Sequence, residues 1–158
     1  MTTVYLALGS NIGDSQANIS QAIELLGDSV KQIKQAPIYA SKAVGYTNQP
    51  DFLNTALTGQ TDLEPQDLLA FIKDVEHNIG RTATFHHGPR EIDIDIIFYG
   101  DAIINTPTLT IPHPDFRNRD FVLKPLSDLK PDLMDPVSHK TVSHLLGDLN
   151  QSQISILK

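Results

Sequence analysis

The chain has 158 residues, which is the size of one domain, and it has no cysteine, which excludes a disulfide framework and a thiolate metal site. Twelve Lys and Arg against nineteen Asp and Glu give a net charge of −7, so no excess positive charge is available to neutralise a nucleic-acid backbone. No apolar stretch has the length of a signal-peptide core or a membrane span. We therefore predict one cytoplasmic domain over residues 1–158, with no nucleic-acid or membrane partner. We also expect it to be a monomer.

The N-terminal third predicts a strand, a helix and a second strand. Residues 3–8 favour a strand, and the Gly- and Asn-rich turn at 9–14 leads into a helix over 15–26, where apolar residues recur at helical spacing. A second strand ends near Ala40, and Pro37 within it marks an edge position or a break.

The next segments predict a loop, a third strand and a second helix. Residues 41–51 have no apolar period and collect Gly, Asn, Pro and Asp, which is typical of a long loop. Residues 52–58 follow as a strand. Pro65 then opens a helix that ends at Gly80.

Residues 88–100 predict a strand that carries carboxylates within an apolar run. Alternation along a strand puts three acidic residues on one face: Glu91, Asp93 and Asp95. It puts four apolar residues on the other: Ile92, Ile94, Ile96 and Phe98. Neighbouring carboxylates can hold Mg²⁺, but they can also form the solvated face of a half-buried strand, and the strand alone favours the solvated face.

The arginines give a reason to reconsider that preference. All four fall between positions 81 and 119: Arg81, Arg90, Arg117 and Arg119. Planar guanidinium groups suit bidentate phosphate recognition, so their clustering around the aspartates indicates a phosphate and metal site.

The element order predicts an α+β fold with a ferredoxin-like βαββαβ core, in which both helices cover one face of a mainly antiparallel sheet. Residues 103–104 and 109–111 are expected to extend this sheet as added C-terminal strands. Short helices are expected over 117–123, before Pro125, and over 141–146, within a peripheral C-terminal region that starts at residue 130.

The segment His86-x-Gly88-Pro89-Arg90-x-x-Asp93-Ile94-Asp95 resembles the signature of the 6-hydroxymethyl-7,8-dihydropterin pyrophosphokinases of folate biosynthesis. Further blocks agree with this family in the same order: Gly9-Ser10-Asn11, the run 48–54, Gly80-Arg81, Ile111-Pro112-His113, and Arg117-Asn118-Arg119-x-Phe121. Several ordered blocks distinguish the family from chance agreement at one of them.

The resemblance implies that the pterin hydroxymethyl oxygen attacks the β-phosphorus of ATP, which releases AMP and leaves a pterin diphosphate. It also implies two Mg²⁺ ions between the protein and ATP. Asp93 and Asp95 match the metal-binding pair, and with Arg81 and Arg90 they match the catalytic residues.

The resemblance also divides the remaining site residues between the two substrates. Those that match ATP-binding positions, besides Arg81 and Arg90, are Glu76, Thr110, His113 and Arg119. Those that match pterin-binding positions are Ser41, Val44, Gly45, Phe52, Asn54 and Phe121, among which the two phenylalanines stack on the ring and Asn54 reads its polar edge.

Three departures from close relatives concern the phosphate side. The 81–88 loop has no basic residue after Arg81, His87 stands where some relatives have tryptophan, and Pro114 replaces an aromatic residue. Two other functions remain as alternatives: a different metal-dependent phosphoryl enzyme, and a ferredoxin-like RNA-binding module, which the acidic charge disfavours.

Overall fold

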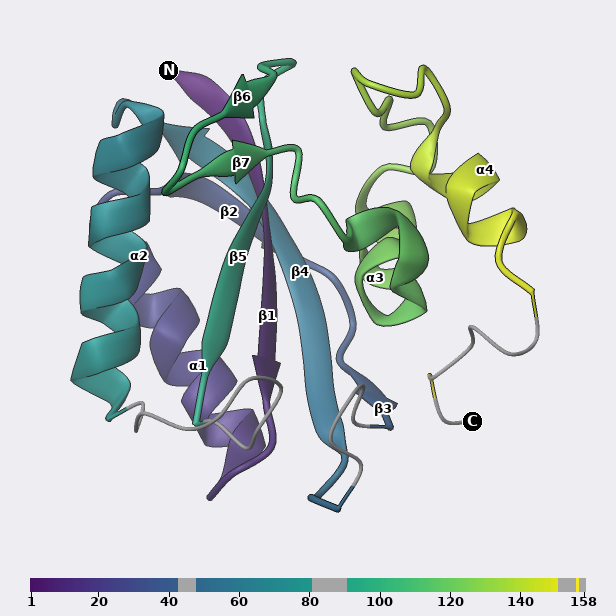
Figure 1. Cartoon of the computed structure of the whole chain (residues 1–158). Coiled ribbons are helices and arrows are strands. Elements are labelled where there is room, and N and C mark those ends of the chain that lie inside the picture. The colour runs from purple at the N-terminus through teal and green to yellow at the C-terminus, as the bar shows by residue number, and fades with distance from the viewer. Residues whose placement is uncertain (43–47, 81–90, 151–155, 157–158) are drawn as a thin grey trace.

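A five-stranded antiparallel sheet forms the centre of the protein in the computed structural model, which describes residues 1–42, 48–80, 91–150 and Ile156. β1 (Thr2–Ser10) lies in the middle and pairs with β4 (Phe52–Thr61) and with β5 (Asp93–Tyr99) (Figure 1). β2 (Lys31–Gln35) and β3 (Tyr39–Ser41) pair with opposite ends of β4. The strand predicted to end near Ala40 is thus two strands, because Pro37 between them has no N–H to donate.

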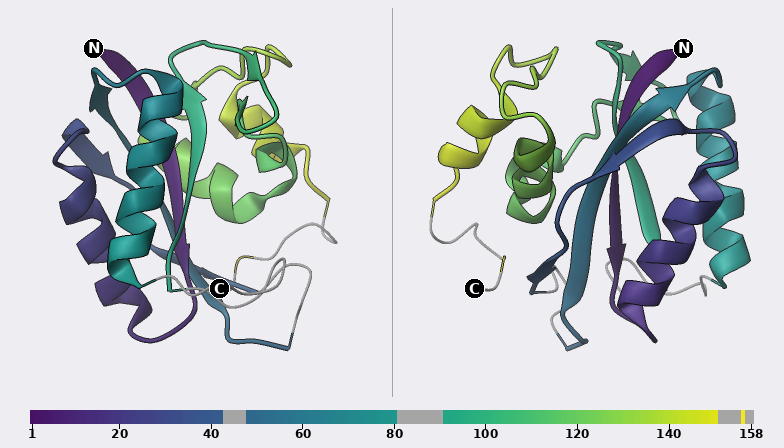
Figure 2. Two further views of the ribbon diagram at one scale, coloured as in Figure 1. Left: turned by 60° about the vertical axis from the view of Figure 1, so that its left-hand side comes forward. Right: turned by 180° about the vertical axis from the view of Figure 1, so that it is seen from behind.

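Two helices cover one face of this sheet, as predicted (Figure 2). α1 (Ser15–Leu26) has the predicted bounds, and α2 (Pro65–Ile79) begins at the predicted proline. Gly80 ends α2 with φ of 91°, a left-handed conformation that favours glycine. The apolar sides of both helices pack on buried residues of β1 and β5 and form the first core, which confirms the ferredoxin-like arrangement.

The opposite face is covered by residues 116–129. Residues 142–147, in the region predicted to be peripheral, pack mainly on these residues, but they bury Val142 and Leu145 in a shared core, so the region is not wholly peripheral. The 3₁₀ turn η1 (Phe116–Asn118), α3 (Asp120–Leu129) and α4 (Val142–Gly147) pack there around a second core (Figure 2). Pro125 lies inside α3 instead of after it. Burial of the α3 side chains against the sheet stabilises the helix by more than one missing backbone hydrogen bond costs.

β6 (Ile104–Asn105) and β7 (Thr110–Ile111) form a separate two-stranded sheet, so the prediction that they extend the main sheet is wrong. The two strands pair with each other, and Leu109 and Ile111 are buried in the first core. Their burial folds the hairpin over the β5 edge.

A β-bulge in β5 corrects one further prediction. Leu6 pairs with Ile96, but the next residue of β1, Tyr5, pairs with Phe98, so Ile97 is an extra residue in β5. Ile97 and Phe98 are both buried in the second core, whereas Ile96 belongs to the first. Phe98 therefore does not share a face with Ile96, because the bulge shifts the alternation by one residue.

Gly59 in β4 gives a stability prediction, because a Cβ there would lie 2.5 Å from Val30 Cγ1 and 2.9 Å from the Lys31 carbonyl oxygen. We expect Gly59→Ala to destabilise the fold by about 2 kcal/mol through overpacking. Chemical denaturation with Gly147→Ala as the control tests this, since a Cβ at Gly147 meets nothing within 4 Å. Equal stability of the two variants would refute the steric argument.

No helix in the described part of the chain is long and apolar enough to cross a membrane.

Candidate active site

The aspartate pair lies on the sheet face that α3 covers. Asp93 pairs across the sheet with Gly9, which pairs in turn with Asn54, and Asp95 pairs with Ala7 in the next row of the same face. Side chains that are opposite each other on neighbouring strands share a face, so Asn54 and the aspartates belong to one surface. This row joins the predicted metal pair to the predicted pterin residues.

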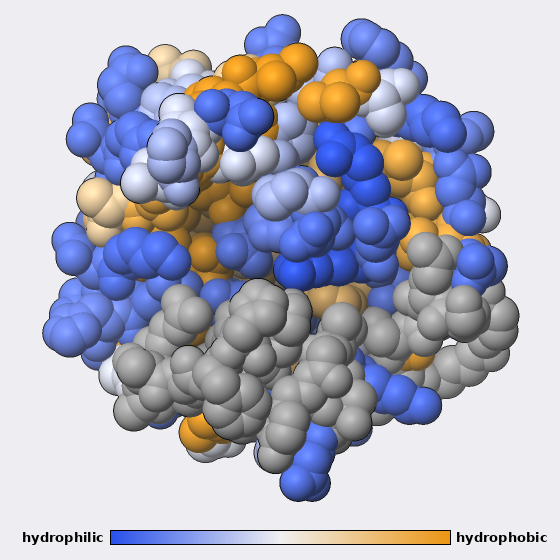
Figure 3. Space-filling view, in the orientation of Figure 1, coloured by the Kyte–Doolittle hydropathy of each residue, from blue (hydrophilic) through white to orange (hydrophobic). Residues whose placement is uncertain are grey.

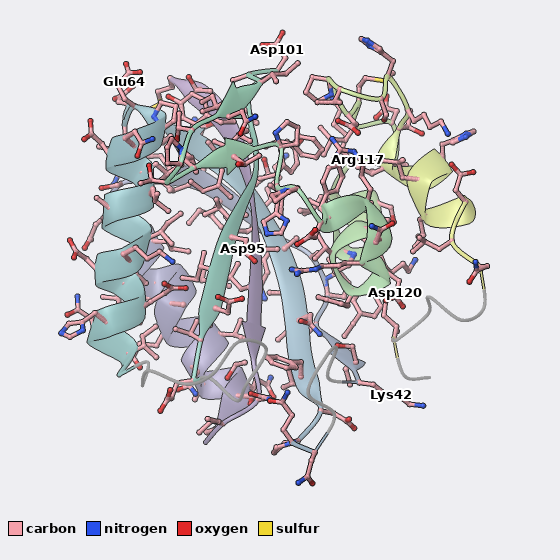
Figure 4. The ribbon with its side chains drawn as sticks, in the orientation of Figure 1. Lys42, Glu64, Asp95, Asp101, Arg117 and Asp120 are labelled. Atoms are coloured by element: carbon pink, nitrogen blue, oxygen red, sulfur yellow. The ribbon has the colours of Figure 1, made fainter. Side chains whose placement is uncertain are left out.

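Asp95 is in an electrostatically unfavourable position in the metal-free protein. It lies beside β5 on the side toward α3 (Figure 4), with about a third of its side chain exposed, 32%. Burial, and then the charge of Asp93, raises its pKa to about 7, while the Arg119 guanidinium opposes the rise. A divalent cation between the two carboxylates would relieve this repulsion.

A backbone hydrogen bond to His113, which follows β7, fixes which ring nitrogen carries the proton. Its Nδ1 accepts a hydrogen bond from the Asp115 backbone N–H at 3.1 Å, so the neutral ring carries its proton on Nε2. Nε2 lies 3.8 Å from Asp95 Oδ2. Burial, and then the positive charge of Arg119, lowers the pKa of His113 to about 4, so near neutral pH the ring is an uncharged donor facing the carboxylates.

Arg119 stands at the start of α3, next to both predicted substrate sites. Its guanidinium carbon lies 5.8 Å from the centre of the Phe121 ring, and one of its nitrogens lies 3.6 Å from Asp115 Oδ2. Its charge also acts on Asp95 and His113. Arg117, in contrast, donates a hydrogen bond from Nε to Oδ2 of the buried Asp135 at 2.6 Å. The arginines that cluster in the sequence therefore do not form one phosphate site.

Glu76 of α2 contacts β5, the strand that carries the two aspartates. Its side chain is buried, and Oε2 accepts a hydrogen bond of 2.8 Å from the backbone N–H of Ile94, the residue between the two aspartates. Lys73 lies 3.3 Å from Oε1. These contacts fix α2 against β5, and the predicted contact of Glu76 with ATP stays a prediction.

A cleft of about 300 Å³ runs along the β5 edge between α2 and the β6–β7 hairpin. Its polar lining includes Asp95, His113, Thr110 and Lys73, and its apolar lining includes Leu69 and Ile96. Figure 3 shows a hollow with a hydrophobic floor in this region, left of centre. The cleft brings three predicted site residues together and adds Lys73, which sequence reasoning missed although it stands one helical turn before Glu76.

The predicted pterin residues of β3 and β4 form a second polar site on the α3 side. Asn54 Nδ2 donates a hydrogen bond of 2.6 Å to Ser41 Oγ, and both residues are buried. A Cβ at Gly9 would lie 3.0 Å from Asn54 Oδ1 and 3.6 Å from Phe52 Cδ1, so the glycine leaves room for both side chains. Four predicted site residues lie outside the described residues: Val44, Gly45, Arg81 and Arg90.

The donor set fits magnesium bound together with a nucleotide. Asp93 and Asp95 supply carboxylate oxygens from one strand face, and the described residues contain no group of three or more His, Cys, Asp or Glu side chains placed to hold a metal. Mg²⁺ characteristically takes one or two carboxylates and fills its other positions with water and substrate phosphates. Fold and site thus define a ferredoxin-like domain in which a carboxylate pair lies between a cleft and a buried polar group, Asn54 and Ser41.

Comparisons with known proteins identify the family. The family model described as 7,8-dihydro-6-hydroxymethylpterin-pyrophosphokinase matches residues 5–131. A 2-amino-4-hydroxy-6-hydroxymethyldihydropteridine pyrophosphokinase from Aquifex aeolicus is 47% identical over 140 residues, which are 89% of this chain and 88% of the relative. The chain belongs to this pyrophosphokinase family, which confirms the family and the enzyme class predicted from sequence.

Other relatives contain the same domain within longer chains. A folic acid synthesis protein from Dictyostelium discoideum is 46% identical over 90% of this chain, which spans 22% of that protein. The crystal structure of a Plasmodium falciparum HPPK-DHPS with pteroate has a TM-score of 0.75 at 16% identity and is matched over 92% of this chain and 42% of its own. At that identity the likeness supports the fold alone.

Proposed function

We propose that the chain transfers the pyrophosphoryl group of ATP to the hydroxymethyl group of 6-hydroxymethyl-7,8-dihydropterin, giving the pterin diphosphate and AMP in folate biosynthesis. The observation that supports this proposal is the row Asn54–Gly9–Asp93, in which Asn54, proposed to read the pterin edge, shares a sheet face with the carboxylate pair. The β5-edge cleft adjoins the same carboxylates. Family membership supplies the reaction.

In this proposal ATP occupies the β5-edge cleft, with its phosphates toward Asp95 and its base toward the hairpin residues around Thr110. The neutral His113 donates its Nε2–H to a phosphate oxygen, which adds no charge repulsion to the nearby Arg119. Arg119, together with Arg81 and Arg90, binds the phosphates as negative charge redistributes from the β-phosphorus to the leaving AMP.

Asp93 and Asp95 would hold two Mg²⁺ ions, which neutralise phosphate charge and orient the triphosphate. The protein residues then act mainly through positioning and electrostatics, because the attacking oxygen belongs to the pterin. Asn54 holds the ring edge, and the rings of Phe52 and Phe121 stack on its faces, with Ser41, Val44 and Gly45 lining the pocket. We also propose a cytoplasmic location, in keeping with a sequence without cysteine, and a monomeric state.

The product of ATP tests this function. Incubation of the protein with Mg²⁺, ATP and the hydroxymethyl dihydropterin should yield AMP and pterin diphosphate in equal amounts, and omission of either the pterin or Mg²⁺ should stop the reaction. Stoichiometric ADP would indicate an ordinary kinase, and free phosphate would indicate a phosphatase. Either product in place of AMP rejects the proposal.

A further inference from the structure

Asp120 is a buried carboxylate that the proposed chemistry leaves without a role. It lies in the first turn of α3, between Arg119 and Phe121, and is 1% exposed (Figure 4). Its Oδ2 accepts a hydrogen bond of 2.8 Å from the backbone N–H of Ile156, 36 residues further along the chain. A charged acceptor buried at a helix start forms one of the stronger hydrogen bonds available to a backbone N–H.

Ile156 also contacts the other wall of the pterin site. It forms an isolated antiparallel bridge with Ser41, the last residue of β3. Ser41 Oγ in turn accepts the hydrogen bond from Asn54 Nδ2 at 2.6 Å. Three direct contacts, Asp120–Ile156, Ile156–Ser41 and Ser41–Asn54, therefore connect the start of α3 to the amide predicted to read the pterin edge.

β3 needs such support because it is an edge strand of three residues. A ladder this short contributes little stability by itself. A second tie joins β3 to α3, since the Tyr39 hydroxyl donates a short hydrogen bond to Asp128 Oδ2. That hydrogen bond raises the pKa of Tyr39 to about 12, so the phenol keeps its proton across the physiological range.

We propose that Asp120 and Ile156 are positioning residues for the pterin: Ile156, held by Asp120, fixes Ser41 and so fixes which way the Asn54 amide points. Asn54 Nδ2 is committed to Ser41, and Oδ1 lies over Gly9, 3.0 Å from where a Cβ of that residue would be, which leaves Oδ1 as the acceptor for the pterin edge. This inference rests on the proposed pterin site. It predicts an effect on pterin affinity that the ATP side does not share, because the β5-edge cleft lies on the other edge of the sheet.

Two matched pairs of variants in the full chain test the inference. Ile156→Pro removes the N–H that Asp120 accepts, whereas Ile156→Ala keeps it. Asp120→Ala removes the acceptor, whereas Asp120→Asn keeps an oxygen at this position. We measure the Kd of the oxidised, fluorescent 6-hydroxymethylpterin with an excess of a non-hydrolysable ATP analogue, the Kd of that analogue, kcat, and thermal stability.

We expect about tenfold weaker pterin binding for Ile156→Pro and Asp120→Ala, as expected for the loss of one hydrogen bond to a charged group. The analogue Kd and kcat should stay within about twofold. Ile156→Ala should bind the pterin like the wild type, and Asp120→Asn, which keeps a neutral acceptor, should weaken pterin binding less than Asp120→Ala does. Wild-type pterin affinity in Ile156→Pro, or equal weakening of both ligands, would overturn the inference. Failure of the wild-type protein to bind the pterin would instead reject the proposed function, so the two failures are distinguishable.

Discussion

Asp95→Asn is expected to slow turnover by about a thousandfold and, at the same time, to stabilise the metal-free protein above pH 7. Removing one carboxylate from the pair removes half of the protein's proposed Mg²⁺ ligands, and we expect kcat to fall by about a thousandfold. The stabilisation follows from the pKa of Asp95, which burial and Asp93 raise from 3.8 to about 7. A charge that is unfavourable in the folded state disappears in the variant.

The pH dependence of this stabilisation has a definite sign. Between about pH 4 and pH 7 the folded protein holds a proton on Asp95 that the unfolded chain has released, so stability falls as pH rises through this window. Above pH 7 Asp95 is charged in the folded protein as well, and the full loss of stability caused by its buried charge is present. Asp95→Asn should therefore raise Tm by roughly 3 °C or more at pH 8 and by less at pH 5.

Thermal melts with and without Mg²⁺ plus a non-hydrolysable ATP analogue measure both effects. The wild-type Tm should rise with the added ligands, and the Asp95→Asn Tm should change little. Asp101→Asn, an exposed substitution on the turn after β5, is the control and should behave like the wild type. Full ligand-induced stabilisation of Asp95→Asn would remove the metal role from this residue.

Arg117→Ala is expected to lower the free energy of unfolding more than Gly59→Ala does. Asp135 is fully buried and accepts hydrogen bonds from Arg117 Nε at 2.6 Å, Arg117 Nη2 at 3.0 Å, Ser138 Oγ at 2.7 Å and the Val137 N–H at 3.0 Å. Removing the guanidinium leaves a buried carboxylate without its counter-charge, which costs roughly 3 kcal/mol. Denaturant unfolding at pH 7 measures this loss.

The same ion pair makes the effect of Arg117→Ala dependent on pH. Burial alone raises the pKa of Asp135, but the hydrogen bonds from Arg117, Ser138 and Val137 outweigh it and hold the pKa below its usual value. A depressed folded pKa contributes stability above the unfolded pKa, and this stability is lost as pH falls through the folded pKa. The difference between wild type and variant should therefore shrink in acid.

Lys140→Ala provides the matched control for Arg117→Ala. Lys140 pairs with Asp148 at 3.3 Å, and both side chains are 49% exposed, so its loss should cost less than about 1 kcal/mol. Similar losses in the two variants would show that the burial of Asp135 does not matter. A normal catalytic rate in folded Arg117→Ala is also expected, because Arg117 is engaged away from the aspartates.

The elements that could be predicted from sequence are those with a clear local pattern. The helix over Ser15–Leu26, the start of α2 at Pro65 and the shared face of Asp93 and Asp95 all follow from periodicity and capping, and the structure confirms them. The Ile97 bulge has no local signal, because an extra residue in one strand depends on its partner.

The C-terminal region shows a different limit of sequence reasoning. From residue 130 the sequence predicts one short helix followed by a polar tail, so the region is expected to be peripheral. Its position depends on the second sheet face, which α1 and α2 leave uncovered. The same holds for the site, since spacing paired the aspartates but only the fold brought Lys73 to the cleft and Ile156 to Asp120.

Gly9 pairs with Asn54 on one side and with Asp93 on the other, so the central strand β1 fixes the distance between these two residues. Two strand spacings of about 4.8 Å separate Asn54, the residue predicted to hold the ring edge, from Asp93, the residue predicted to hold the metal, roughly 10 Å in all. In the proposed site, an acceptor held by Asn54 at its ring edge would have to reach across β1 to bring its hydroxyl to the phosphate. If the proposed roles of Asn54 and Asp93 hold, we expect an acceptor of the wrong length to bind at its ring edge and to remain unreacted.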